Sequence, residues 1–167
     1  MPGTSVLAHS GADSHVETGV PVLDRLIELA ARAGRFQIRL SLTPVEPPEA
    51  EVDAAGAELG RSLRVLLQAR DAKGHGLGMM PTDEALASVV VEVSGRPLVA
   101  SNVDLAQSHL GGLNADLPQR FLSALADAAG LTIHVRLMEG EETAHVVDAI
   151  FKALGVALAD ACTVVSD

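Results

Sequence analysis

The sequence has few aromatic residues and little positive charge. Its 167 residues include three phenylalanines, Phe36, Phe121 and Phe151, and neither tryptophan nor tyrosine. Base-stacking platforms and aromatic membrane belts therefore lack their side chains. Twelve basic residues stand against 22 acidic ones, and the formal net charge of −10 repels phosphate backbones and anionic lipids. We expect no nucleic-acid partner.

Cysteine and long apolar runs are also scarce. Cys162 is the single cysteine, so no internal disulfide can form, which is usual in a reducing cytoplasm. No apolar stretch approaches the roughly 18 residues of a membrane span, and no signal peptide is recognisable. We expect a cytoplasmic protein without a membrane partner. Hydrophobic residues still make up 48% of the chain, enough for a sizeable core that must be aliphatic.

The chain contains an internal repeat. At an offset of 95, residues 25–63 overlay residues 120–158 without a gap, and 12 of the 39 pairs are identical. The identical pairs include Asp53 with Asp148, which we interpret as charges placed near helix ends, and the dipeptide Leu59-Gly60, which recurs as Leu154-Gly155. Such self-similarity predicts two copies of one structural unit.

Each copy is predicted to run helix, strand, loop, helix. Hydrophobic spacing places helices near residues 23–32 and 116–129, and alternation predicts strands over residues 36–42 and 131–137. Further helices follow over residues 50–69 and 143–162, with Asp116 and Thr143 as candidate N-caps.

The predicted fold class is α+β, a tandem duplication of a half-domain with two helices on a small sheet and a pseudo-two-fold axis. Residues 1–167 form one domain of two repeats, about 4–80 and 81–162. Residues 88–93 and 97–103 are expected to pair as a hairpin around Ser94-Gly95-Arg96, with a weaker equivalent pair within residues 4–20. The glycine-rich stretch 74–78 is interpreted as a flexible connection.

Several motifs of the sequence resemble those of one known protein family. Residues 18–26, TGVPVLDRL, resemble the family's T-G-I-x-F-x-D-H-x-L, and residues 81–86, PTDEAL, resemble P-x-D-E-A-L. The segments SGRP at 94–97, AGLTIHV at 129–135 and DAIFKA at 148–153 follow in the family's order. The motifs resemble those of imidazoleglycerol-phosphate dehydratase, a family of histidine biosynthesis. The resemblance implies the fold of that family, which is similar to the second domain of ribosomal protein S5. It also implies a homo-oligomer, a trimer that can build a 24-subunit shell with manganese between subunits.

The resemblance fails at the metal ligands. The family's two H-H-x-x-E motifs become residues 49–53, EAEVD, and residues 144–148, AHVVD, and the histidine of its Asp-His pair becomes Arg25. The resemblance therefore leaves His145, Asp148 and His134 as candidate metal ligands, so that no cofactor is expected beyond residual divalent-metal binding. His145 and Asp148 are better explained by the solvated start of a helix, and His134 by a surface or interface position.

Some other residues at the positions of the family's site are retained. Asp83 and Glu84 are candidate catalytic carboxylates, or acidic residues that begin an element of secondary structure. By resemblance, Arg96 and Lys152 bind the phosphate of a small phosphorylated ligand, although Arg96 can also be an exposed hairpin corner. We favour a dehydratase-like protein that is catalytically impaired or inactive and retains an assembly or ligand-binding role. The alternative is an active, metal-dependent lyase with an atypical site.

Overall fold

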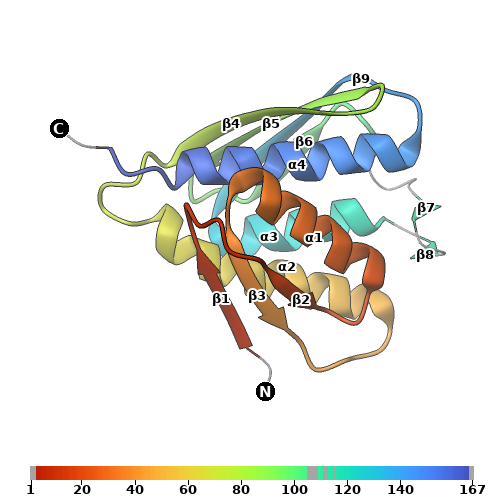
Figure 1. Cartoon of the computed structure of the whole chain (residues 1–167), viewed down its shortest axis with the longest axis horizontal. Coiled ribbons are helices and arrows are strands. Elements are labelled where there is room, and N and C mark those ends of the chain that lie inside the picture. The colour runs from red at the N-terminus through yellow and green to blue at the C-terminus, as the bar shows by residue number, and fades with distance from the viewer. Residues whose placement is uncertain (1–2, 105–108, 111–112, 115, 166–167) are drawn as a thin grey trace.

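The computed structural model describes residues 3–104, 109–110, 113–114 and 116–165 (Figure 1). The first half contains β1 (Gly3–Leu7), β2 (His15–Glu17), α1 (Pro21–Gly34), β3 (Gln37–Ser41) and α2 (Pro48–Leu67). The second half contains β4 (His75–Thr82), β5 (Ala85–Val93), β6 (Leu98–Ser101), the short pair β7 (His109–Leu110) and β8 (Leu113–Asn114), α3 (Leu117–Ala129), β9 (Leu131–Glu139) and α4 (Thr143–Ala161).

The two main sheets repeat one topology. In the first sheet, of order β1-β3-β2, the central β3 is antiparallel to β1 and parallel to β2. In the second, of order β4-β5-β9-β6, β9 is likewise antiparallel to β5 and parallel to β6. The order β1, β2, α1, β3, α2 thus recurs as β5, β6, α3, β9, α4, and β4 is an additional edge strand. This confirms the predicted α+β class and its duplicated half-domain.

The helices lie in two facing layers. α1 and α2 cover the first sheet, α3 and α4 cover the second, and the layers meet where α1 packs on α4 and α2 packs on α3. In Figure 1 the second sheet lies along the upper side of α4, and α1 crosses below that helix. Each half therefore buries its helices against the other half.

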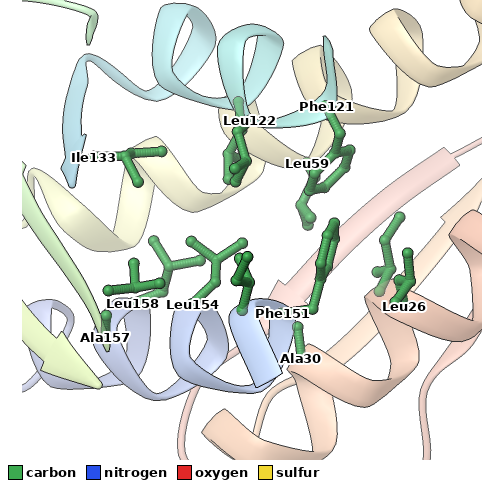
Figure 2. Close-up of a cluster of buried hydrophobic side chains, with 14 of the residues drawn as sticks. Leu26, Ala30, Leu59, Phe121, Leu122, Ile133, Phe151, Leu154, Ala157 and Leu158 are labelled. Carbon is green, nitrogen blue, oxygen red and sulfur yellow. The ribbon is translucent and has the colours of Figure 1, made fainter. Parts of the chain in front are cut away.

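The core between the helix layers is aliphatic apart from its phenylalanines, as the composition predicted. Figure 2 shows Phe121 of α3 and Phe151 of α4 facing each other, with ring centroids 5.5 Å apart, and both side chains are fully buried. Leu59 of α2 and Leu154 of α4, which correspond in the repeat, line the same layer. One hydrophobic cluster thus joins both halves.

Two glycines permit the close helix contacts. A Cβ atom on Gly155 of α4 would lie 2.0 Å from the carbonyl oxygen of Ala30 in α1. A Cβ atom on its repeat equivalent, Gly60 of α2, would lie 2.7 Å from the Cβ atom of Ala128 in α3. Such distances are far below van der Waals contact, so the recurrent Leu-Gly dipeptide serves helix packing in both halves.

The predicted hairpins are wrong. β5 and β6 are not neighbours, because β9 lies between them, and β1 and β2 are separated by β3 in the same way. Residues 94–97 form a crossing connection, in which Gly95 has a φ of 71°. Local turn signals cannot reveal a strand that inserts from later in the chain.

The glycine-rich stretch is a strand rather than a flexible connection. β4 pairs with β5 along its whole length, from His75 opposite Glu92 to Thr82 opposite Ala85. Cβ atoms on Gly76 and Gly78 would lie 2.0 Å and 2.1 Å from carbonyl oxygens of α4. The glycines therefore let β4 lie directly on that helix.

The helix starts differ in detail from the prediction. Asp116 occupies the N-cap position of α3, and Glu142 rather than Thr143 occupies that of α4, but neither side chain makes a cap hydrogen bond. The carboxylate of Asp116 instead lies 3.6 Å from Nη1 of Arg120.

The proposed division of the chain into two repeats between residues 80 and 81 falls inside β4 and stays a prediction. No helix in the described ranges is long and apolar enough to cross a membrane.

Candidate functional site

The tight turn between β4 and β5 carries the two candidate carboxylates. Asp83 and Glu84 form this turn, and Asp83 has a φ of 50°, in the left-handed region that aspartate tolerates. The turn lies against the start of α4, where Oε1 of Glu84 accepts a hydrogen bond from the backbone N–H of Glu142 at 3.0 Å. The acidic pair and the first turn of α4 are therefore one structural unit.

His145, in the first turn of α4, lies between the two carboxylates. Its Nδ1 atom is 2.7 Å from Oε2 of Glu84, and its Nε2 atom is 3.2 Å from Oδ2 of Asp83. The structure thus brings together three of the predicted site residues, two named as catalytic and one as a metal ligand.

This arrangement favours the charged forms of both partners. The hydrogen bond from the Glu142 backbone, followed by that from His145, lowers the pKa of Glu84 from 4.5 to about 2. The hydrogen bond to Glu84 raises the pKa of His145 above its usual 6.5, against a smaller opposing effect of burial. An imidazolium ring donates from both nitrogens and has no lone pair for a metal.

Lys152 approaches the same turn from one side of α4. Its ammonium group donates a hydrogen bond to the carbonyl oxygen of Pro81 at 2.8 Å, close to the end of β4. An ammonium group has three donors, so Lys152 can hold Pro81 and still bind an anion. A shallow hollow of about 440 Å³, lined by Glu84, Glu141, Glu142, Ala144 and His145, opens at the start of α4.

Asp148, one turn further along α4, is held by Arg25 of α1. Nη2 of Arg25 lies 2.8 Å from Oδ1 of Asp148, and Nη1 lies 3.2 Å from Oδ2. This bidentate contact raises the pKa of Arg25, chiefly through the hydrogen bond to Asp148. Both carboxylate oxygens of Asp148 therefore face a guanidinium group.

Arg96 and His134 lie away from this cluster. Arg96 follows the end of β5 that is far from the Asp83–Glu84 turn. Because a strand rises about 3.4 Å per residue, Arg96 lies roughly 30 Å from that turn along the strand. Its backbone is fixed by Ser94 and Thr132, since its N–H donates to Oγ of Ser94 and its carbonyl accepts from Oγ1 of Thr132. Within one chain Arg96 and Lys152 are therefore too far apart to bind the same phosphate.

His134 occupies the exposed face of β9, between the buried residues Ile133 and Val135. That face is turned away from α4, whereas His145 lies at the start of the helix. One chain therefore does not bring His134 together with His145 or Asp148.

The donors in one chain do not fit a divalent metal site. Manganese prefers octahedral coordination by carboxylate, carbonyl, imidazole or water ligands. Asp148 is neutralised by Arg25, and both nitrogens of His145 face carboxylates. In the described part of the chain, no three His, Cys, Asp or Glu side chains are arranged to hold an ion.

Sequence reasoning missed the partner of Arg25. It identified Arg25 as the residue in place of a family histidine, and Asp148 as a candidate ligand, but did not connect them. The available signal was the repeat itself, because Arg25 with Arg120 and Asp53 with Asp148 are both identical pairs.

Known proteins resemble most of this chain. The sequence profile of imidazoleglycerol-phosphate dehydratase matches residues 18–158. An imidazoleglycerol-phosphate dehydratase of Clostridium botulinum (strain Kyoto / Type A2) is 35% identical over 149 residues, 87% of this chain and 76% of the relative. One from Caldicellulosiruptor saccharolyticus is 33% identical over 156 residues, 91% of this chain and 80% of the relative.

Solved structures of the same family are also similar to this chain. The crystal structure of the Staphylococcus aureus imidazoleglycerol-phosphate dehydratase superposes with a TM-score of 0.86 at 29% identity, covering 97% of this chain and 94% of the other. The Pyrococcus furiosus protein, solved in complex with (S)-C348, gives a TM-score of 0.79 at 29% identity, covering 93% and 87%. The fold and the sequence together show that the chain belongs to the imidazoleglycerol-phosphate dehydratase family.

Proposed function

We propose that this chain is a member of the histidine-biosynthesis dehydratase family that lacks normal dehydratase activity and keeps the scaffold for assembly or for binding a small phosphorylated ligand. The observation that carries the proposal is the contact between Arg25 and Asp148. Arg25 stands where the family motif has a histidine, and Asp148 stands where it has the glutamate of H-H-x-x-E.

The chemistry explains why this replacement matters. The family reaction removes a hydrogen from a carbon of little acidity, and bound metal makes the imidazole of the substrate an electron sink. A guanidinium group carries a permanent positive charge and has no lone pair to offer a metal. Arg25 therefore replaces a donor with a group that repels a cation.

The outer face of the second sheet supports the proposed assembly. Its exposed side chains include Leu77 and Met79 of β4, Val90 of β5, Leu98 of β6 and Met138 of β9, each at least 41% exposed. The outer face of the first sheet exposes polar residues, such as Ser5 and Arg39, together with Leu7, which is 57% exposed. Exposed large apolar side chains on one face are common at protein interfaces, so we propose a homo-oligomer, a trimer or a shell, that associates without metal.

An active dehydratase with an atypical site is the second candidate. The cluster of Asp83, Glu84 and His145 supports it, because an imidazolium can protonate a departing hydroxyl group while a carboxylate removes a proton. Lys152, at the same turn, is available for a phosphate.

A direct assay separates the candidates. Purified protein is incubated with Mn²⁺ and imidazole glycerol phosphate, beside the C. botulinum relative as a positive control. We expect no turnover above background and less than one bound manganese per chain by elemental analysis. Turnover comparable to that of the relative would reject the proposal and establish the second candidate.

Assembly is tested independently by light scattering with and without a chelator. We expect an oligomer whose mass does not change when EDTA is added. Dissociation on chelation would show that metal bridges the subunits and would contradict the proposed metal-free assembly.

A further inference from the structure

We propose that the cavity between the β1–β2 connection and the C-terminal end of α1 binds a small zwitterion, a molecule that carries both a carboxylate and an ammonium group. The cavity measures about 620 Å³, within the usual range of small-molecule sites. It lies at the opposite end of α1 from Arg25, so it is separate from the cluster at the start of α4. The proposal is independent of whether the chain has dehydratase activity.

The cavity wall carries charges of both signs. Arg32 and Arg35 come from the end of α1, Glu28 from the preceding turn of the same helix, and Asp13 from the β1–β2 connection. Glu28 and Arg32 have the i, i+4 spacing at which opposite charges on a helix usually pair. Across the described residues, however, none of these four side chains makes a hydrogen bond or ion pair. Two cationic and two anionic groups are therefore left to face a ligand.

The floor of the cavity is apolar. Ala31 and Phe36 line it, and both are buried in the core at 1% and 4% exposure. An apolar floor between opposite charges fits a short carbon chain that joins an anionic to a cationic end. A purely anionic ligand would leave Glu28 and Asp13 facing like charge.

The backbone of Arg35 supports the assignment. Arg35 has a φ of 57°, in the left-handed region, where the repeat-equivalent residue is Gly130 with a φ of 72°. The two positions are structurally equivalent, since Ser10 N–H donates to the carbonyl of Arg35 at 2.8 Å as Gly95 N–H donates to that of Gly130 at 3.1 Å. Glycine adopts this conformation without strain, so the arginine adds a side chain at a conformational cost.

That side chain extends beneath the loop. A Cβ atom on Gly11 would lie 3.5 Å from Nη2 of Arg35, which places the guanidinium group beside the β1–β2 connection. A strained residue whose side chain lines a cavity is typical of a binding site.

Three probes with the same four-carbon skeleton test the charge requirement. Calorimetric titration of the full chain uses γ-aminobutyrate as the zwitterion, butyrate as the anion and butylamine as the cation. We expect γ-aminobutyrate to bind in the millimolar range, with a Kd at least about tenfold below those of butyrate and butylamine. Equal affinity for butyrate, or no binding of γ-aminobutyrate, would overturn the proposal.

Variants locate the binding to this cavity. Arg35→Gly adopts the residue that the second repeat already carries, so it should fold, and we expect it to weaken γ-aminobutyrate binding about tenfold or more. Glu28→Gln should weaken it by removing the partner of the ammonium group. The matched control is Arg70→Gly, an exposed arginine outside the cavity, which should bind as the unmodified chain does. Unchanged binding by both cavity variants would reject this site.

Discussion

Arg25 of α1 binds Asp148 of α4 through both carboxylate oxygens, and the repeat makes the same contact a second time in reverse. Arg120 of α3, which corresponds to Arg25, binds Asp53 of α2, which corresponds to Asp148, with Nη2 to Oδ2 at 2.8 Å and Nε to Oδ1 at 3.2 Å. The hydrogen bond to Asp53 is the main cause of a raised pKa of Arg120. Each half therefore supplies the arginine of one pair and the aspartate of the other.

Removing one ion pair should reveal a modest coupling. A double-mutant cycle of Arg25→Met and Asp148→Asn, measured by urea unfolding, should give a coupling free energy of about 0.5–1 kcal/mol. The value is limited because Arg25 is 51% exposed, although Asp148 is only 19% exposed. The equivalent cycle of Arg120→Met and Asp53→Asn should give a similar value. Additive single-mutant effects in both cycles would show that these contacts contribute nothing to stability.

The contact between β4 and α4 predicts a large cost for a single methyl group. Gly78→Ala would place Cβ 2.1 Å from the carbonyl oxygen of Ala153, so either the strand or the helix must move. We expect a loss of at least about 2 kcal/mol in the free energy of unfolding, measured by denaturation. Gly3→Ala is the matched control, because a Cβ atom there meets nothing within 4 Å, and its effect should be close to zero. Equal stability of the two variants would contradict the packing of β4 described above.

The cluster of Asp83, Glu84 and His145 predicts a pH window for its contribution to stability. The pKa of His145 is raised above 6.5, so its contribution is complete below pH 6.5 and is lost as the pH rises through the folded-state pKa. The pKa of Glu84 is lowered from 4.5 to about 2, so its contribution is present above pH 4.5 and is lost as the pH falls toward 2. The contact is therefore strongest between about pH 4.5 and 6.5.

Thermal unfolding of a His145→Gln variant tests this window. We expect the Tm difference from the unmodified chain to be larger at pH 5.5 than at pH 9. A difference that does not vary with pH would show that the imidazole does not titrate against these carboxylates.

Introducing the ligands of the family motif should raise the affinity for metal. The triple variant Arg25→His, Ala144→His and Asp148→Glu rebuilds the second H-H-x-x-E motif and removes the guanidinium group from Asp148. We expect at least about a tenfold gain in Mn²⁺ affinity by calorimetric titration, because imidazole and a free carboxylate are suitable ligands. Arg120→His, at the repeat-equivalent position of α3, serves as the control and should show no gain. An unchanged affinity in the triple variant would contradict the proposal that these three replacements weaken metal binding.

The sequence predicted the helices and the two central strands well because their signals are local. Leu23, Leu26 and Ile27 mark the buried face of α1, and Ile38 and Leu40 mark that of β3. Because the second half repeats the first, the same helices and strand were predicted there. Strand order was not predictable in this way, since the insertion of β9 between β5 and β6 depends on contacts between distant segments.

The prediction of a flexible connection at the glycines of β4 was wrong for a related reason. Gly76 and Gly78 lower the intrinsic preference for a strand, and only the proximity of α4 explains them. In the candidate site, Asp83, Glu84 and His145 were each identified, but their meeting depends on how the β4–β5 turn docks on α4. Arg96 was grouped with Lys152 by resemblance, and no local pattern could show that β5 holds them apart.

The reciprocal contacts have the geometry of an isologous association, in which two identical subunits exchange the same pair of surfaces. Arg25 with Asp148 and Arg120 with Asp53 are one subunit contact made twice, and Gly155 and Gly60 occupy matching places in it. The chain is thus equivalent to a two-fold dimer of half-length proteins joined end to end. Because the two halves are fused in one chain, their sequences need not be identical. The two outer sheet faces can therefore differ in polarity while the shared interior remains symmetric.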